Sequence, residues 1–405
     1  MTVKGLRMRM WRPIRVRSRP FTGRLRVLPA VTPRERLTFL QFPWQVYRDD
    51  PNWVPPIITE RRDFIDPAKN PFFEHAEADY FIAWRDHQPV GTIAAFINHA
   101  HNAFHNENIA FFGFFEVLPD REAAEALLET ALNWARQWGC TALRGPAQFS
   151  TNDECGLLVD GFDSPPMVLM TYNPRYYVDF LEGAGFTKAM DLYAYYIDTS
   201  VLGRRVEELP PKLLRLVDML QERTQVRVRP VNMRDFYNEV ERFKYVYNRA
   251  WERNWGFVPM TDAEIDHLAR NLKPLVDPDI IFIAEVGDEP VGVSLSLPNL
   301  NEPLLRARPG PQVWSVPLTL GRFLWHRRHI TSLRVFALGI IEKYRGQGID
   351  ALFYYHTAQA AYPKGYTWAE MSWILENNVM MNRGIRSMGG RVYKTYRFYE
   401  KAVSG

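Results

Sequence analysis

The 405-residue chain contains only two cysteines, Cys140 and Cys155. Two thiols cannot build a disulfide framework or a cysteine-based zinc site, and such sparse use is typical of a reducing compartment. The sequence also has no stretch of the ~18 uncharged apolar residues needed to cross a bilayer and no apolar core of a secretory signal near its start. These absences predict a cytoplasmic protein without a transmembrane segment.

A strong net charge is also missing, because 50 Lys and Arg are balanced by 46 Asp and Glu. This balance argues against a nucleic-acid partner. The exception is the beginning of the chain, where residues 1–32 contain nine Lys and Arg and the first acidic residue is Glu35. We expect residues 1–22 to form a basic, solvated arm, and a weak contact of this arm with an anionic membrane surface is the functional alternative.

The chain repeats itself. The segment "LRVLP" at 25–29 matches "VRVRP" at 226–230, and "FIAWRDHQPVG" at 81–91 matches "FIAEVGDEPVG" at 282–292, both 201 residues apart. Matches continue through the chain at changed offsets, which predicts two copies of one fold. Extra residues are expected around 144–170 in the first copy and 299–332 in the second. Each copy reads as strand, helices, hairpin, strand, helix, strand, helix and strand, an α/β plan.

The second copy carries a glycine-rich junction, "EKYRGQGIDALFYY" at 342–355. An apolar run before it predicts a buried strand, and apolar residues at helical spacing from Ile349 predict a helix after it. Glycines 346 and 348 would let a phosphate approach the free N–H groups at the start of this helix, and Arg345 would add a charged contact. The junction therefore predicts a site for a phosphate-bearing ligand.

This junction resembles the acyl-CoA loop of the GNAT superfamily of N-acyltransferases, and "ENNVMMNRGIRSMGG" at 376–390 resembles a later helix and turn of that family. The resemblance covers both halves of the chain, as in bacterial tandem GNAT-like proteins. It implies an α/β (α+β) fold of two tandem GNAT-like domains, each with a mixed, mostly antiparallel sheet flanked by helices. The expected parts are the arm at 1–22, a degenerate domain at 23–200, a linker helix at 201–224 and a domain with an acyl-CoA loop at 225–405.

The first copy has lost the equivalent loop. It reads "VLPDREAAE" at 117–125, which places Pro119, Asp120 and Glu122 where the second copy has Arg345 and the two glycines. Proline has no N–H to donate, and two carboxylates would repel a phosphate. We therefore expect catalysis in the second copy and a structural or substrate-shaping role for the first.

The resemblance implies transfer from acetyl-CoA or a longer acyl-CoA, without a metal, to a small-molecule amine or an amino-lipid. The cofactor contacts that it implies are Leu338, Ile340, Ile341, Arg345, Gly346, Gln347, Gly348 and Ile349. A general base must take a proton from the amine; Glu376, beside Asn377, is the first candidate. Glu342 is the second candidate. The case for it is weaker, because the first copy, where no cofactor is expected to bind, has a matching glutamate at Glu116.

Two residues depart from the family pattern. Asp350 stands where a small residue is usual, so its side chain must turn away from a bound phosphate. Ile385 stands where the family often has a tyrosine that protonates the departing thiolate. Tyr354 is the candidate replacement, although a packed tyrosine is the alternative.

The acceptor is expected to contact "YNRAWERNWGFVP" at 247–259. Trp251 and Trp255 would share a helix face, with Asn254 beside them and Gly256 ending the helix. Asn152 and Glu154, in the extra residues of the first copy, are further candidates. Core packing for the tryptophans, and a loop that satisfies its own backbone for the other two, are the alternatives.

Three other functions stay open at this point. A metal could bind His99, His101 and His105, but no carboxylate or cysteine stands at a recognisable ligand spacing. A non-catalytic module could bind acyl-CoA or a small ligand and regulate or scaffold. A transferase could instead use aminoacyl-tRNA, which would employ the basic arm.

Overall fold

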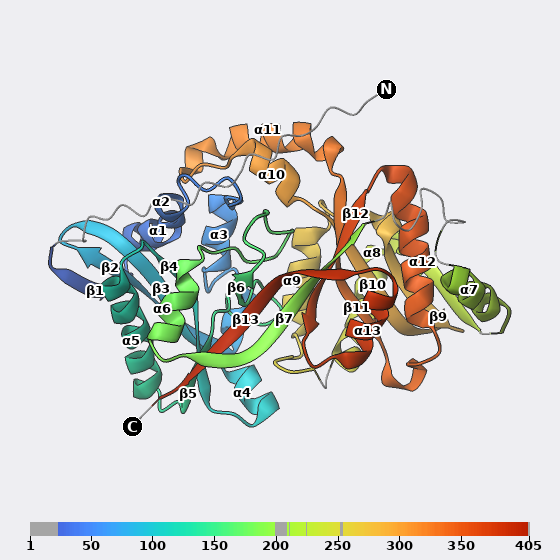
Figure 1. Cartoon of the computed structure of the whole chain (residues 1–405), viewed down its shortest axis with the longest axis horizontal. Coiled ribbons are helices and arrows are strands. Elements are labelled where there is room, and N and C mark those ends of the chain that lie inside the picture. The colour runs from blue at the N-terminus through green and yellow to red at the C-terminus, as the bar shows by residue number, and fades with distance from the viewer. Residues whose placement is uncertain (1–22, 199–208, 210, 224, 252–253, 404–405) are drawn as a thin grey trace.

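The computed structural model describes residues 23–198, 209, 211–223, 225–251 and 254–403, and the arm predicted for residues 1–22 lies outside them (Figure 1). The first copy contains β1 (Leu25–Pro29), α1 (Pro33–Gln41), α2 (Pro43–Val46), α3 (Ile58–Phe64), β2 (Ala76–Arg85), β3 (Gln88–Asn98), α4 (His99–His105), β4 (Ile109–Val117), α5 (Arg121–Gln137), β5 (Ala142–Gly145), β6 (Leu157–Asp160), α6 (Tyr176–Gly183) and β7 (Thr187–Asp198).

The second copy follows α7 (Pro211–Arg223), which lies within the predicted linker. It contains β8 (Val226–Pro230), α8 (Phe236–Ala250), α9 (Asp262–Leu272), β9 (Ile281–Val286), β10 (Glu289–Pro298), α10 (Asn301–Ala307), α11 (Val316–His326), β11 (Ser332–Ile340), α12 (Ile349–Ala361), β12 (Trp368–Leu375), α13 (Val379–Ser387) and β13 (Arg391–Ala402). The repeat seen in the sequence is confirmed, because β1 and β8 coincide with the first matched pair and the hairpins β2–β3 and β9–β10 with the second.

The strands form one sheet in the order β1-β2-β3-β4-β5-β13-β7-β12-β11-β10-β9-β8, with β6 beside β13. The last strand of each copy lies next to the fifth strand of the other, since β13 pairs with β5 and β7 pairs with β12. Among the described strands only the pairs β4–β5 and β11–β12 are parallel, which confirms a mixed, mostly antiparallel sheet. In Figure 1 the exchanged strands, green β7 and red β13, run side by side between the two copies.

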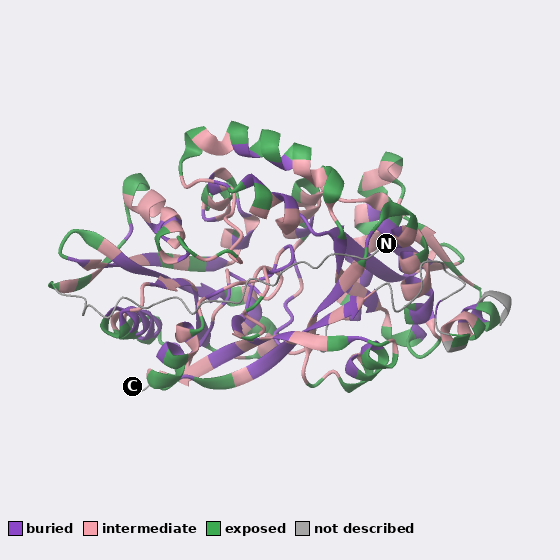
Figure 2. Ribbon diagram, turned by 45° about the horizontal axis from the view of Figure 1, so that its top comes forward, coloured by how far each residue is buried: buried purple, intermediate pink, exposed green. Residues whose placement is uncertain are grey.

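Helices bury both faces of this sheet. Helix α5 begins after its N-cap Asp120, as predicted, and packs the apolar face that contains Leu127 and Leu128 against the first copy's strands. On the other face, α1 and α3 cover an aromatic cluster centred on Phe149. The strands carry most of the buried residues in Figure 2, and the helices expose their outer sides. No helix among the described residues is long and apolar enough to span a membrane.

A buried arginine joins the two copies. Arg334 of β11 has no exposed surface, and its Nη1 donates to the carbonyl oxygens of Val168 at 2.8 Å and Leu169 at 2.9 Å. Its Nε donates to Ser372 Oγ at 2.9 Å and lies 3.8 Å from the equally buried carboxylate of Glu370. The guanidinium thus satisfies the backbone of a first-copy loop from a second-copy strand.

We expect Arg334→Met to lower the free energy of unfolding by about 3–5 kcal/mol, because it leaves a buried carboxylate and two buried carbonyls without their donor. Urea denaturation followed by tryptophan fluorescence measures this change. Arg229→Met is the control, because its guanidinium pairs with Glu285 at 2.7 Å but is 20% exposed. A loss below about 1 kcal/mol in Arg334→Met, typical of surface pairs, would contradict the structural role.

Candidate functional site

The parallel strands β11 and β12 separate along their length. They pair from Ser332↔Trp368 to Val335↔Met371, and β11 then continues to Ile340 paired with β10. Among the described residues, the β12-facing edge of β11 therefore has no strand partner over 336–340. We call this opening the second-copy gap. The predicted cofactor contacts Leu338 and Ile340 lie on it, and Ile341 follows directly.

The glycine-rich junction lies at the end of the second-copy gap. Gly346 has a φ of +74°, and a Cβ placed there would meet no atom within 4 Å. Gly348 is the N-cap of α12 with a φ of +81°, and no side chain caps that helix end. A Cβ at Gly348 would lie 2.6 Å from Leu220 of α7, so this glycine also allows a close packing contact.

The other residues of the junction line up around these glycines. Gln347 and Asp350 are exposed, so the carboxylate of Asp350 has turned to the surface. Ile349, the first residue of α12, is buried. Arg345 Nε donates to the carbonyl of Ile340 at 3.0 Å, and its Nη2 donates to the carbonyl of Ala250 at 2.6 Å. In this structure Arg345 therefore holds the end of β11 against the end of α8.

The matching helix end in the first copy is closed. Asp120 Oδ1 accepts the N–H of Ala123 at 3.2 Å, and Asp120 also pairs with Arg85 at 2.6 Å. Its strand gap is closed as well, because a Cβ at Gly113 would lie 1.7 Å from the carbonyl oxygen of Ala147. In the first copy, backbone therefore fills the strand gap and the Asp120 carboxylate caps α5, which leaves no space for a phosphate.

A tryptophan side chain packs on the face of β11, beside the second-copy gap. A Cβ at Gly339 would lie 2.2 Å from the Trp251 ring, which shows that Trp251 stands against β11 at the centre of the predicted thioester contacts. The ring of Trp251 is 4.8 Å from that of Tyr247. The Tyr247 hydroxyl donates to Asn152 Oδ1 at 2.7 Å. Trp251 and Asn152 therefore belong to one connected group.

The predicted shared face of Trp251 and Trp255 is wrong. Helix α8 ends at Ala250, so the two side chains do not follow helical spacing. Trp255 lies in a turn, where its ring is 5.3 Å from Phe398 of β13 and also 5.3 Å from the Arg144 guanidinium. Asn254 is in the same turn, with its N–H donating to the carbonyl of Trp251 at 2.8 Å. Trp255 is thus packed between the copies.

The candidate catalytic residues of the second copy are spread out. Glu376 accepts from Lys188 Nζ at 2.6 Å and from the N–H of Asp191 at 3.1 Å, and Asn377 beside it is exposed. Glu342 is exposed in the turn after β11. Tyr354 lies between α12 and α13 with its hydroxyl 3.4 Å from Met381 Sδ, and Ile385 is fully buried nearby.

A cavity of about 830 Å³ lies between the two copies. It is bounded by α3, β4 and the loops 146–157 and 166–173 of the first copy, and by α9 and α10 of the second. Its wall is mainly apolar, including Phe64, Phe114, Met170, Leu268, Leu272 and Leu304. Residues more than 200 positions apart in the chain therefore meet in one space, which we call the inter-copy cavity.

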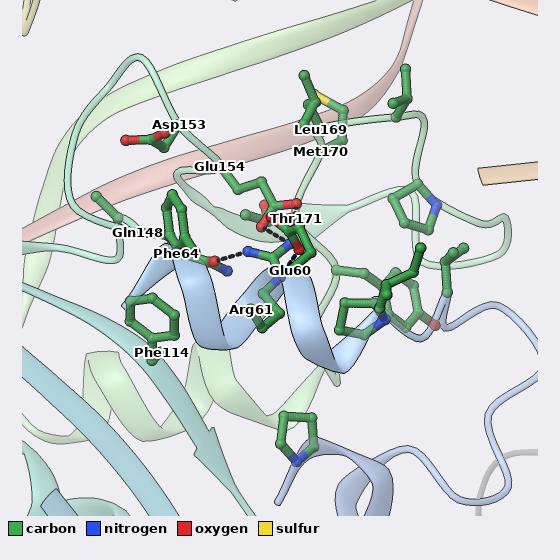
Figure 3. Close-up of a pocket in the computed structure, with 18 of the residues that line it drawn as sticks. Glu60, Arg61, Phe64, Phe114, Gln148, Asp153, Glu154, Leu169, Met170 and Thr171 are labelled. Atoms are coloured by element: carbon green, nitrogen blue, oxygen red, sulfur yellow. Dashed lines mark hydrogen bonds and ion pairs between the residues drawn. The ribbon is translucent and has the colours of Figure 1, made fainter. Parts of the chain in front are cut away.

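Charged groups cluster at one side of the inter-copy cavity (Figure 3). Arg61 Nη2 donates to both carboxylate oxygens of Glu154 at 2.7 Å, and its Nη1 donates to Gln148 at 2.7 Å. Burial raises the pKa of the neighbouring Glu60. Glu154, a predicted acceptor contact, thus reaches the cavity with its charge already paired. Asn152 reaches the cavity with its amide already hydrogen-bonded, to the Tyr247 hydroxyl and to the carbonyl of Val258.

Two further cavity carboxyls have a pKa near neutrality. Burial raises the pKa of Asp153 to about 7, against the lowering effect of the Ser150 hydroxyl, which donates to it at 2.8 Å. Burial also raises the pKa of Glu116 to about 7, although the hydroxyls of Tyr47 and Tyr177 donate to it at 2.8 Å. Groups with such values can accept or release a proton at physiological pH.

Backbone strain surrounds the inter-copy cavity. Phe114, Phe149 and Leu169 have φ values of +48°, +80° and +58°, in the left-handed region that large side chains avoid. Phe114 and Leu169 line the cavity, and Phe149 packs on Phe114 with ring centroids 5.2 Å apart. Residues in this conformation cost about 1–3 kcal/mol each and concentrate at binding and catalytic sites. The strain therefore favours the cavity as a functional site.

The sequence alone did not reveal the cavity, Asp153 or the role of the first copy's helix α3. Asp153 lies between the two acceptor candidates Asn152 and Glu154. The sequence therefore indicated the loop, but not the residue in it whose pKa is near 7. Arg61 and Glu60 fall in "ITERRDF" at 58–64, a charged segment after a Pro-rich stretch. That pattern is common at protein surfaces, and only the fold places it opposite Glu154.

The three histidines considered for a metal each contact a different group. His99 lies against Glu77, His101 Nε2 is 2.9 Å from Glu107, and His105 Nε2 is 2.7 Å from the carbonyl oxygen of Phe257. In the part of the chain that the structure describes, no group of three or more His, Cys, Asp or Glu side chains could hold a metal ion.

Comparison with known proteins places the chain among acyltransferases. The model of the Acetyltransferase (GNAT) family matches residues 41–152. The chain is 35% identical over 393 residues to a protein of Caulobacter vibrioides (strain NA1000 / CB15N) named bacterial ceramide synthase, covering 94% of this chain and 98% of that one. It is 33% identical over 373 residues to Protein YghO of Escherichia coli (strain K12), covering 90% and 92%.

A solved structure has the same arrangement of two copies. A tandem GNAT protein from the clavulanic acid biosynthesis pathway aligns over 94% of this chain and 99% of that chain, with a TM-score of 0.56 at 12% identity. At this identity the likeness concerns the fold, and it agrees with the tandem organisation expected from the repeat.

Proposed function

The chain belongs to the GNAT family of acetyltransferases, and we propose that it joins a fatty acyl group from acyl-CoA to the amino group of a long-chain amino-lipid. The observation that carries this proposal is the inter-copy cavity, which is large, mainly apolar and acidic at one side. Such a space suits a hydrocarbon chain that ends in an ammonium group. The name of the Caulobacter relative, a ceramide synthase, supports the same acceptor class, because a ceramide is an N-acylated long-chain amino alcohol.

The acyl-CoA site is proposed at the junction of the second copy. The open space at Gly346 and the uncapped start of α12 fit a diphosphate, whereas the first copy's helix is capped by Asp120. The thioester would then lie along the open edge of Leu338–Ile341, and the Trp251 ring covers the face of this strand at Gly339. The first copy offers no such edge, because the N–H of Ala147 donates to the carbonyl of Phe112 at 2.9 Å.

The acceptor's amine is proposed to lie at Asp153. This residue lines the inter-copy cavity and follows Asn152, which connects through Tyr247 to Trp251 on the face of β11. Val168 and Leu300 line the cavity and pack in one cluster with Leu295 and Ala337 of β10 and β11. The cavity wall and the strand that borders the second-copy gap therefore share one hydrophobic cluster, against which Trp251 also packs.

The chemistry follows from these positions. Asp153, as a carboxylate, takes a proton from the ammonium group, so that the nitrogen has a free electron pair to attack the thioester carbonyl. The carbon–nitrogen bond forms and the carbon–sulfur bond breaks, the nitrogen passes its second proton to the departing sulfur, and CoA leaves as the thiol, while Asp153 releases its proton to solvent. Backbone N–H groups at the open edge of β11 would stabilise the oxyanion. Glu376, Glu342 and Tyr354 stay predictions for the same transfer.

We expect Leu268→Trp to shorten the accepted amine. An indole in the cavity wall should lower kcat/KM for a long-chain amine by about 10–100-fold, because one or a few methylene groups lose their space. A short-chain homologue should react as before. Release of CoA thiol, with the amide product identified by mass spectrometry, measures both. Leu268→Met, similar in volume, is the control.

The same assay separates the alternatives. Equal losses for long and short amines in Leu268→Trp would show that the cavity does not hold the acceptor chain. Tight acyl-CoA binding with no transfer to any amine by the wild-type protein would favour the non-catalytic ligand-binding module. Only turnover decides against that module.

A further inference from the structure

Helix α11 carries an apolar face on the outside of the molecule. Trp314, Leu318 and Trp325 are 80%, 58% and 62% exposed, and Leu320 and Leu324 are 42% and 61% exposed. Trp314 lies in the short 3-10 turn Val313–Ser315 that leads into α11, and Leu318 and Trp325 follow it by four and eleven positions, which places them on one side of the helix. Leu320 and Leu324, four positions apart, extend this apolar surface around the helix. Figure 1 shows α11 along the upper rim of the protein, and Figure 2 shows exposed, green residues on its outer side.

The inner side of this helix is already used for packing. Thr319 and Phe323 are 4% and 6% exposed, and Phe323 belongs to the hydrophobic cluster beneath α11. The helix is therefore apolar on both faces, and the described residues of the protein cover only the inner one. Large contiguous exposed apolar surfaces in soluble proteins mark sites of interaction with a partner or a membrane.

The surrounding segment has charge of one sign. Residues 303–341 contain no Asp or Glu but contain six arginines. Arg306, Arg308, Arg322 and Arg328 are exposed, and the Arg328 guanidinium lies 4.6 Å from the centre of the Trp325 ring. Tryptophans at both ends of an apolar helix, with arginines beside them, are typical of helices that lie in the interface of an anionic bilayer.

The position of α11 connects this surface with the inter-copy cavity. Helix α10, which packs against α11, contributes Asn301 and Leu304 to the cavity wall. The connection between the two helices is anchored on the first copy, because Trp44 Nε1 donates to the carbonyl of Pro309 at 3.0 Å and Gln41 Nε2 to that of Pro311 at 2.7 Å. The apolar face thus lies on the structural unit that bounds the cavity from outside.

We propose that α11 and the arginines of residues 306–328 form a docking surface that inserts into one leaflet of an anionic lipid bilayer. A second copy of this chain is a poorer occupant, because a symmetric contact would place the same arginines opposite one another without an acid in the segment. This inference concerns membrane attachment and stands independently of the proposed transfer reaction.

Vesicle flotation with the full-length protein tests the proposal. The wild type should bind vesicles of phosphatidylcholine and phosphatidylglycerol and bind vesicles of pure phosphatidylcholine much less. Trp314→Ala combined with Trp325→Ala should weaken binding to the anionic vesicles by about 100-fold, on the order of tenfold for each indole. Arg327→Gln combined with Arg328→Gln should weaken it by about 30-fold.

A matched control is available in the first copy. Trp138 is 47% exposed at the end of α5, so Trp138→Ala removes an exposed indole from another surface and should bind vesicles like the wild type. Vesicle binding by the double tryptophan variant equal to that of the wild type would overturn the proposal, and so would a wild type that binds neither vesicle. A wild type that forms dimers dissociated by the tryptophan changes, without vesicle binding, would assign the face to a second copy.

Discussion

Gly346→Glu is expected to raise the KM for acyl-CoA by about 100-fold or more while the protein stays folded. The space at Gly346 is open, so the new side chain causes no collision, but it places a carboxylate where the diphosphate of CoA is proposed to lie. Two unit charges at 4 Å repel by about 4 kcal/mol at an effective dielectric constant of about 20, which exceeds a hundredfold change in affinity. The positive φ of +74° adds strain for any residue with a side chain.

The matched control is Gly365→Glu. Gly365 has a φ of +81°, and no atom lies within 4 Å of a Cβ placed there, so the two substitutions carry the same strain and the same charge. Gly348 is unsuitable, because its added side chain would also collide with Leu220. Calorimetric titration with CoA and steady-state kinetics measure the effect. If Gly346→Glu and Gly365→Glu bind CoA equally well, the diphosphate lies elsewhere and the second copy loses its proposed role.

The order of elements could be predicted because the chain contains it twice. Two weak hydrophobic patterns at one offset support each other, and both hairpins lie where the patterns predict them. The exchange of β7 and β13 could not be predicted. Both strands are long, aromatic and end their copy, so either copy's fifth strand offers a similar partner, and only the packed structure selects the crossed pairing.

The candidate site was harder to predict because it is built from distant segments. Glu154, Leu268 and Leu304 are ordinary residues in their own elements and become neighbours only when the copies join. The tryptophan prediction was wrong for a local reason, since it depended on α8 continuing to Gly256, whereas the helix ends at Ala250. Trp251 nevertheless reaches the predicted thioester strand from the turn that follows.

Asp153→Asn is expected to lower kcat for acyl transfer by about 10²–10⁴-fold, the usual contribution of a general base. The amide keeps the size of the side chain and can still accept the hydrogen bond that Ser150 donates at 2.8 Å, so the loop should keep its conformation. Only the ability to take a proton is removed. Single-turnover measurements with saturating acyl-CoA isolate this step from substrate binding.

The pH profile gives a second, independent readout. The pKa of Asp153 is about 7, raised by burial, so the residue loses its basic form as the pH falls through 7. Wild-type kcat should therefore decrease on the acid side with a midpoint near 7, and this limb should vanish in the residual activity of Asp153→Asn. Any titration of the substrate amine itself would be shared by both proteins and does not affect the difference between them.

Glu116→Gln is the control that tests which of the two carboxyls reacts. Glu116 lines the same cavity with a pKa of about 7, but the Tyr47 and Tyr177 hydroxyls hold it at strand β4. If Asp153 is the base, Glu116→Gln should keep the acid limb of the profile. If Glu116→Gln loses that limb and Asp153→Asn keeps it, the proton transfer occurs at Glu116. Loss of the limb in Glu376→Gln alone would make Glu376, after the end of β12, the base. The Lys188 ammonium, which donates to Glu376, would then position its carboxylate.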